Sequence, residues 1–101
     1  MPADEQKPLA PVHPGEILRE EFLQPLGLTP YALGGALRVP RTRIERLVRG
    51  ETSLTADTAL RLARYFGTTP DFWLRLQTAH DLRVEERRIA AELERIAPRA
   101  A

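Results

Sequence analysis

The side chains of this sequence best suited to chemistry are arginines, gathered in the stretch VPRTRIERLVRG at residues 39–50. Guanidinium groups bind phosphates and can pair through two hydrogen bonds with O6 and N7 of guanine, so the cluster is suited to a polyanion. The whole chain of 101 residues has a formal net charge of only +1, which by itself indicates no such partner. Residues 38–64, however, hold seven arginines against three acidic residues, and this net charge of +4 leaves the remainder negative.

Other chemistries find little support. The chain has no cysteine, which excludes disulfides, thiolate metal sites and cysteine nucleophiles. His13 and His80 are far apart in the sequence, and no group of histidines and carboxylates has the spacing of a metal site. The paired glutamates at 20–21 and 85–86 point about 100° apart on a helix and do not form a catalytic dyad. We therefore expect no enzyme activity, no metal, no cofactor and no small-molecule substrate.

The sequence also gives expectations about compartment. No apolar run approaches the roughly 20 residues that a membrane span needs. The first residues, MPADEQKPLAPVHPG, lack the cationic and apolar regions of a signal peptide. We therefore expect a cytoplasmic protein without membrane contact, and the prolines and polar residues of 1–13 predict a flexible leader.

Start and stop signals divide the rest of the chain into short helices. Thr29 is a good N-cap before a helix over 30–37, which begins with a proline. Pro40 disfavours helical geometry at the residue before it, so the chain turns there and a second helix runs over 41–49 to Gly50. Two short helices joined by a three-residue turn predict a helix-turn-helix.

Further helices surround this pair. One is expected over 16–24, ended by Pro25 and Gly27. Two more begin at the N-caps Thr55 and Thr69, and a mostly polar helical tail follows from residue 81. No segment alternates with a period of two, so we expect an all-α fold without a sheet.

The helix over 41–49 has two distinct sides. At 100° per residue, Ile44, Leu47 and Val48 cluster on one side, and the arginines lie on the others. Charge alone would be compatible with an ordinary solvated helix. The preceding helix and turn favour a different interpretation, because reading of the DNA major groove needs a helix braced by a second one.

The same residues carry a resemblance. The segment TPYALGGALRVPRTRIERLVRG, residues 29–50, resembles the helix-turn-helix of the XRE (Cro/repressor-like) family, with a small residue at Gly34 and aliphatic residues at the expected places. The flanking segments HPGEILREEFL and TADTALRLARYFGTTPDFWLRLQTAHDL resemble HigA-type antitoxins of bacterial HigB/HigA toxin–antitoxin modules. The resemblance covers about residues 12–82.

The resemblance implies a five-helix lambda-repressor-like DNA-binding domain over 14–80 with a C-terminal helical extension over 81–101. It implies a homodimer that represses its own operon by binding a palindromic operator in double-stranded DNA. It also implies a RelE-like ribonuclease toxin that the protein neutralises. Two alternatives stay open: a stand-alone XRE-type transcriptional regulator without a toxin, and a helical adaptor whose arginines bind an acidic protein.

The sequence and the resemblance together give candidate site residues. For contacts with DNA bases, they are Arg41, Thr42, Arg43 and Arg46. For contacts with DNA phosphates, they are Tyr31, Arg49, Thr52 and Ser53. For a dimer interface, they are Phe72, Trp73, Leu74 and Leu76, although Trp73 is equally suited to the core. The tail over 81–101 is a candidate dimer or toxin contact.

Two departures from the family pattern concern the turn and the helix before it. Arg38 stands where the family usually has glycine, and a positive φ there would store strain of about 1 kcal/mol. Gly34 and Gly35 stand where alanine is typical, and each costs up to about 1 kcal/mol of helix propensity. Gly34 could allow a close approach of the next helix, whereas Gly35 has no evident role.

Overall fold

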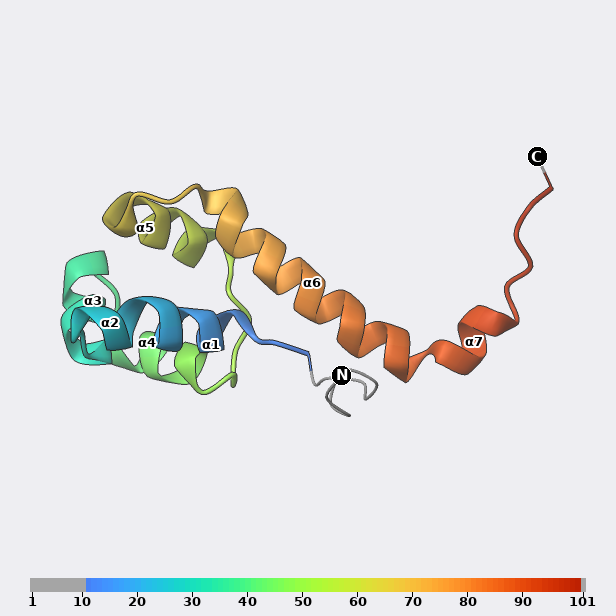
Figure 1. Ribbon diagram of the computed structural model, residues 1–101, viewed down its shortest axis with the longest axis horizontal. Coiled ribbons are helices and arrows are strands. Elements are labelled where there is room, and N and C mark those ends of the chain that lie inside the picture. Colours follow the sequence, from blue (N-terminus) through green and yellow to red (C-terminus); the bar gives the residue numbers. More distant parts are fainter. Residues whose placement is uncertain (1–10, 101) are drawn as a thin grey trace, which may run out of the picture.

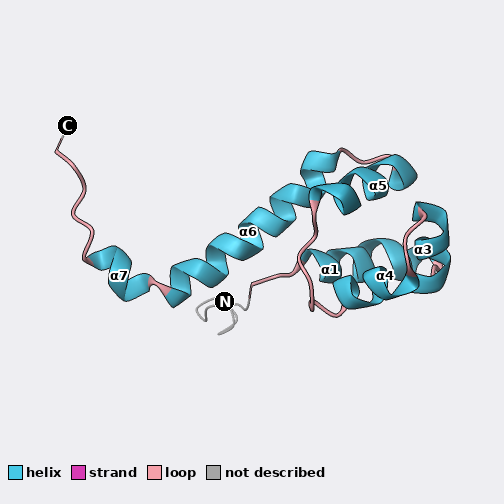
Figure 2. Cartoon of the chain, turned by 180° about the vertical axis from the view of Figure 1, so that it is seen from behind, coloured by secondary structure: helices cyan, strands magenta, loops and turns pink. Residues whose placement is uncertain are grey.

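A computed structural model describes residues 11–100, and every regular element in that range is a helix (Figures 1 and 2). The first three elements follow one another without a break: α1 (Pro14–Ile17), η2 (Leu18–Leu23) and α2 (Gln24–Leu26). The others are α3 (Pro30–Leu37), α4 (Arg41–Val48), α5 (Ala56–Phe66), α6 (Pro70–Arg88) and α7 (Ala90–Glu94). The all-α fold class is therefore confirmed. Most of the predicted leader lies outside the described residues.

The first helical segment passes through Pro25, so the prediction that this proline helps to end it is wrong. Just before it, η2 is a π-helix in which the N–H of Gln24 donates to the carbonyl of Arg19, five residues back. The wider turn relieves the clash between a proline ring and the carbonyl of the preceding turn. The segment ends at Gly27, which adopts the left-handed conformation (φ 63°, ψ 28°) of a helix C-terminus.

Threonine caps begin α3, α5 and α6 at the predicted places. Each side-chain oxygen accepts a hydrogen bond from a backbone N–H three residues on, which satisfies a donor that the helix itself leaves free. The pairs are Thr29 with Ala32 (3.0 Å), Thr55 with Thr58 (3.3 Å) and Thr69 with Phe72 (3.1 Å).

One hydrophobic core joins the helices from η2 to α6. Its apolar side chains are the ones whose helical spacing places them on inward faces, and it fixes α3 and α4 against the elements around them. The buried members are Leu18, Leu23, Leu33, Leu37, Ile44, Leu47, Leu54, Ala59, Leu62 and Trp73.

Trp73 belongs to this core and is fully buried (0% exposed). Its indole N–H donates to the hydroxyl of Thr68 at 2.8 Å, which satisfies its polar group inside the chain. A side chain without exposed surface cannot contact a second subunit, so the dimer-interface prediction is wrong for Trp73. Of the other three predicted interface residues, Leu74 and Leu76 are half-buried against the core and Phe72 is 38% exposed.

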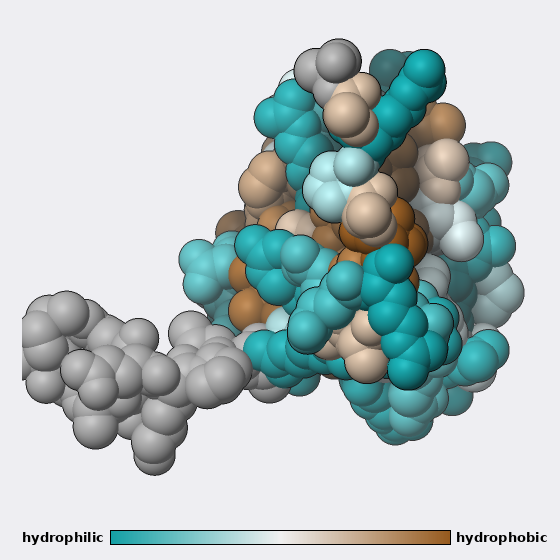
Figure 3. All heavy atoms as spheres, turned by 90° about the vertical axis from the view of Figure 1, so that its right-hand side faces the viewer, coloured by the Kyte–Doolittle hydropathy of each residue, from teal (hydrophilic) through white to brown (hydrophobic). Residues whose placement is uncertain are grey.

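α6 extends well beyond the body formed by the preceding helices, and α7 lies at its far end (Figure 1). The boundary predicted between residues 80 and 81 falls inside α6, which breaks only at Ile89 (φ −111°). Large apolar side chains stay exposed along this extension: Leu82 (54%), Leu93 (44%) and Ile96 (67%). Figure 3 looks at this end of the molecule and shows hydrophobic side chains gathered among hydrophilic ones. None of the described helices is long and apolar enough to cross a bilayer.

Candidate nucleic-acid interface

The turn between α3 and α4 is held by a residue in the left-handed conformation. Arg38 has φ 62° and ψ 44°, and it is the one residue other than glycine with a positive φ among those described. The N–H of Val39 donates to the carbonyl of Gly34 at 2.9 Å, which closes the end of α3. The positive φ considered for Arg38 is therefore present, and a side chain in this conformation costs about 1–2 kcal/mol.

The two adjacent glycines of α3 have different surroundings. A Cβ on Gly34 would lie 3.0 Å from the carbonyl oxygen of Val39 and 3.2 Å from the Cα of Arg41. A Cβ on Gly35 would meet nothing within 4 Å. The absence of a side chain at residue 34 therefore lets α3 approach the start of α4, as the sequence suggested.

α4 has the two sides that its periodicity predicts. Ile44 (0% exposed) and Leu47 (2%) face the core, with Val48 half-buried beside them. The predicted base-contact residues all lie on the exposed side: Arg41, Thr42, Arg43 and Arg46.

The C-terminal end of α4 is fixed by α1 and η2 through contacts that sequence reasoning missed. A Cβ on Gly15 would lie 1.8 Å from the carbonyl oxygen of Leu47, so only glycine allows the two backbones to lie this close. Arg19 donates from Nη1 to the carbonyl of Val48 at 3.2 Å, which satisfies one of the free carbonyls at the helix end. The one local signal of this contact is the glycine of the HPGE segment, because a glycine can mark a close approach of two backbones.

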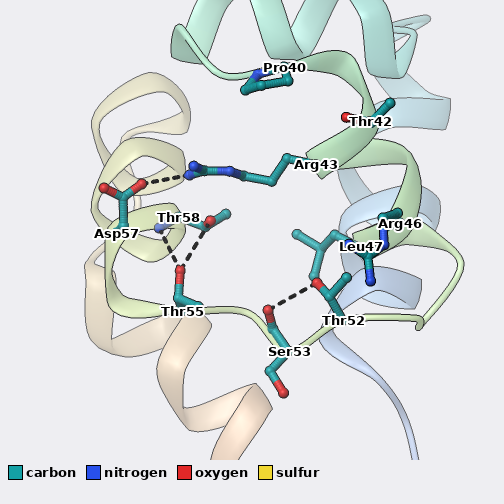
Figure 4. A pocket seen from close by; sticks show the side chains of 10 residues that line it. All are labelled: Pro40, Thr42, Arg43, Arg46, Leu47, Thr52, Ser53, Thr55, Asp57 and Thr58. Atoms are coloured by element: carbon teal, nitrogen blue, oxygen red, sulfur yellow. Dashed lines mark hydrogen bonds and ion pairs between the residues drawn. The ribbon is translucent and has the colours of Figure 1, made fainter.

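A groove of about 650 Å³ separates α4 from the loop before α5 and the first turn of α5 (Figure 4). Its walls carry guanidinium and hydroxyl groups, which donate hydrogen bonds to phosphate oxygens and to base acceptors. Five predicted DNA-contact residues meet here although they come from two segments: Thr42, Arg43 and Arg46 on one side, with Thr52 and Ser53 on the other. The other lining residues are Pro40, Leu47, Thr55, Asp57 and Thr58.

The remaining predicted contact residues lie outside the groove. Arg41 is exposed and its Nε lies 3.5 Å from Oε2 of Glu45, one turn along α4. Tyr31 is 72% exposed near the start of α3, and Arg49 is exposed at the end of α4. All three side chains are exposed on the surface of the protein.

Ion pairs distinguish the arginines of the groove. The Nη1 of Arg43 lies 2.7 Å from Oδ1 of Asp57, and the Nε of Arg61 lies 2.8 Å from the same oxygen. Hydrogen bonds from Arg61 first, and from Arg43, hold the pKa of Asp57 below its ordinary value. The side chain of Arg46 makes no ion pair or hydrogen bond with any residue of the described range, so its guanidinium is free to meet a ligand.

The loop that carries Thr52 and Ser53 is tied to α6. The side-chain oxygen of the buried Gln77 accepts from the N–H of Leu54 at 2.7 Å, and its amide nitrogen donates to Asp81 at 2.8 Å. Because both groups of this buried amide are hydrogen-bonded, the loop keeps a fixed position beside α4.

The structure also brings the two histidines together. The rings of His13 and His80 meet edge to face with centroids 4.9 Å apart, and Nδ1 of His13 accepts from the N–H of Gly15 at 2.9 Å. Burial first, and the neighbouring His80, lower the pKa of His13. Within residues 11–100, no three histidine or carboxylate side chains are grouped as metal ligands would be.

Comparisons with known proteins agree with this geometry. A helix-turn-helix family model matches residues 18–73. Virulence-associated protein I of Dichelobacter nodosus is 56% identical over 75 residues, which cover 74% of this chain and 69% of that protein. Antitoxin HigA-1 of Vibrio cholerae is 47% identical over 72 residues, which cover 71% of this chain and 68% of that protein.

A solved structure gives the same result for the arrangement of helices. The Pseudomonas aeruginosa antitoxin HigA, solved with the higBA promoter, aligns with a TM-score of 0.86 at 40% sequence identity. The alignment covers 89% of this chain and 99% of that one, so it includes much of the C-terminal extension as well as the helix-turn-helix.

Proposed function

Because the chain belongs to the XRE-type helix-turn-helix family, among its HigA-type antitoxins, we propose that it is a sequence-specific DNA-binding repressor of its own operon. The observation that carries the proposal is the groove beside α4, where the unpaired guanidinium of Arg46 lies among donors from two segments. The free side of α4 enters the major groove of double-stranded DNA in the cytoplasm.

The site residues divide into two sets, according to whether they contact the bases or the phosphates of the DNA. The residues that meet base edges are Arg41, Thr42, Arg43 and Arg46. The residues that hold the flanking phosphates are Tyr31, Arg49, Thr52 and Ser53, whose positions beside α4 set the orientation of the protein on the duplex.

The first prediction is that Arg46→Ala weakens binding to the operator far more than binding to random DNA. A two-pronged contact between arginine and guanine contributes about 1–3 kcal/mol of discrimination, whereas a phosphate contact is equal on all sequences. The operator is first selected from a random duplex pool with the wild-type protein. Affinities for the operator and for random DNA are then measured over a series of salt concentrations.

Arg75→Ala is the matched control, because Arg75 is exposed on α6, away from the groove, and the change in charge is the same. Equal losses on the two DNAs would remove Arg46 from the base-reading residues. Affinity that is independent of salt would contradict DNA binding itself and favour the helical adaptor, since each phosphate contact releases counterions.

We also propose that the repressor acts as a homodimer on a palindromic operator. Two copies place their α4 helices in major grooves one helical turn apart, about 34 Å. With Trp73 assigned to the core, Phe72 is the most exposed of the remaining predicted interface residues. Leu74 and Leu76 follow it on α6 and are half-buried. Sedimentation of the wild-type protein and of Phe72→Glu tests this interface.

The second proposed activity is neutralisation of a RelE-like ribonuclease toxin. The exposed apolar side chains of Leu93 and Ile96 on the C-terminal extension support a protein contact there, since they cover no part of the core. The expected toxin gene is a short basic reading frame beside this one.

The prediction is that this neighbour arrests growth when expressed alone and that co-expression of the present chain restores growth. The double variant Leu93→Asp/Ile96→Asp should lose the rescue and keep operator binding, because the extension lies far from α4. Rescue by the variant equal to that by the wild type would exclude these residues from the contact. A neighbour without toxicity would favour the alternative of a stand-alone XRE-type regulator.

A further inference from the structure

A carboxylate stands in the surface that is proposed to meet DNA. Asp57 lines the groove together with Arg43 and Arg46 and is 54% exposed (Figure 4). A negative charge beside a phosphate backbone opposes binding. We therefore expect Asp57 to make a favourable contribution, to folding or to DNA recognition, that outweighs its repulsion of the phosphates.

The contribution is not mainly to the stability of the fold. The guanidinium of Arg43 and the carboxylate of Asp57 are both well exposed (41% and 54%), and ion pairs in water contribute little. What the contacts do fix is direction. Figure 4 shows the side chain of Arg43 extended across the groove from α4 towards Asp57 on α5.

The same carboxylate oxygen also connects to the end of α3. Arg61 donates from Nε to Oδ1 of Asp57 at 2.8 Å and from Nη1 to the carbonyl of Leu37 at 2.8 Å. A continuous chain of charged hydrogen bonds therefore runs from the last turn of α3, through α5, to the first turn of α4. These hydrogen bonds link both helices of the helix-turn-helix to α5, and two of the linked residues, Arg43 and Asp57, line the groove.

We propose that Asp57 is a positioning residue of the DNA interface, which holds the Arg43 side chain across the groove and so limits the orientations in which its guanidinium meets a base. The proposal rests on the proposed function, because it needs a duplex beside α4. An arginine held in one direction loses less freedom on binding than one that is free to rotate. Asp57 thus exchanges some overall affinity for discrimination between sequences.

The test uses Asp57→Ala and the matched control Asp71→Ala in the whole chain of 101 residues. Both residues follow a threonine N-cap by two positions, Asp57 in α5 and Asp71 in α6, so each variant loses the same charge at the same place in a helix. Asp71 lies outside the groove, and no ion pair or hydrogen bond joins its side chain to the described residues. Thermal melting of each variant checks that both are folded.

The measured quantity is the ratio of operator affinity to random-DNA affinity at fixed salt, with single base-pair changes across the operator. Asp57→Ala should bind random DNA more tightly, because a negative charge has left the interface. It should lower the discrimination ratio about five-fold or more, at the base pair where Arg43→Ala also lowers it. In the Arg43→Ala background, the same change should have no further effect on that base pair.

Discrimination by Asp57→Ala equal to that by Asp71→Ala would overturn the proposal. The proposal would also be overturned if Asp57→Ala lowered discrimination at a different base pair from the one affected by Arg43→Ala. The same holds if Arg43→Ala lost equal affinity for the operator and for random DNA. Equal losses of Arg43→Ala on the two DNAs would also remove Arg43 from the proposed base contacts. All of these results leave sequence-specific DNA binding itself in place, because the wild-type protein would still select an operator. If the wild type enriches no sequence from the random pool, the proposed function fails first.

Discussion

Gly34 and Gly35 are identical neighbours in the middle of α3 that differ only in what surrounds them. Each leaves the helix with more backbone freedom to lose on folding than an alanine would. The loss at Gly34 is offset by the close approach of α3 to the carbonyl of Val39 and the backbone of Arg41. Nothing in the described structure offsets the loss at Gly35, whose Cβ position faces open space. Together with the strained Arg38, the pair shows that the helix-turn-helix tolerates residues that cost stability.

The prediction at this scale is that Gly35→Ala raises the free energy of unfolding and Gly34→Ala lowers it. The gain at residue 35 should be about 0.5–1 kcal/mol, from helix propensity alone. The loss at residue 34 should be about 1–3 kcal/mol, because the new methyl group would lie 3.0 Å from the carbonyl oxygen of Val39, and the backbone there would have to shift to make room. Urea unfolding of the two variants and the wild type measures both values. The two variants are each other's control, and a change of the same sign in both would contradict the geometry.

At the scale of helices, local patterns predict where each element begins and which side is buried. Thr29 and Pro30 start α3, and the 3.6-residue period places Ile44 and Leu47 in the core. Five of the DNA-contact candidates share one groove, and their contacts with DNA stay a prediction. Contacts between distant segments leave no such pattern. Asp57 pairs with Arg43 from another helix, 14 residues away.

The same limit explains the other differences. Gly15 is a glycine because the backbone of α4 lies against it, which depends on how two helices pack and not on the residues beside it. Pro25 is a helix breaker by local rules, but the helical segment continues to Leu26 through the π-turn that precedes the proline. Tryptophan is a residue type common at protein interfaces, but Trp73 is fully buried inside the chain. That burial depends on the shape of the core around it, which local sequence does not show.

At the scale of the whole molecule, three separate segments meet at His13. Its side chain begins α1 by accepting from the N–H of Gly15 at 2.9 Å. Its ring lies against Gly50, just after α4, where a Cβ would be 3.6 Å from the imidazole Cγ, and against His80 in the middle of α6. His80 has its own constraint, because its Nδ1 is buried without a hydrogen bond and lies 3.6 Å from Asp81, too far for one.

This junction predicts a loss of stability in mild acid. Burial and the nearby His80 lower the pKa of His13 from 6.5, although the carboxylates of Asp81 and Glu16 and a backbone hydrogen bond at Thr52 act in the opposite direction. The unfolded chain therefore binds a proton at a higher pH than the folded one, and the stability is fully present above about pH 6.5 and falls as the pH drops through the lowered pKa. A protonated Nδ1 would also face the N–H of Gly15 as a second donor.

The measurement is the urea midpoint of the wild type and of His13→Asn between pH 7.5 and pH 5. Asparagine keeps a side-chain oxygen that can accept from Gly15, as N-cap residues do, and it does not titrate in this range. The fall of the midpoint with decreasing pH should be smaller in His13→Asn than in the wild type. An equal fall in both proteins would assign the acid sensitivity to other groups. A wild-type midpoint that rises towards pH 5 would mean that the pKa of His13 is raised in the folded protein, opposite to the direction derived from its burial. The carboxylates of Asp81 and Glu16 would then outweigh burial and His80 at this junction.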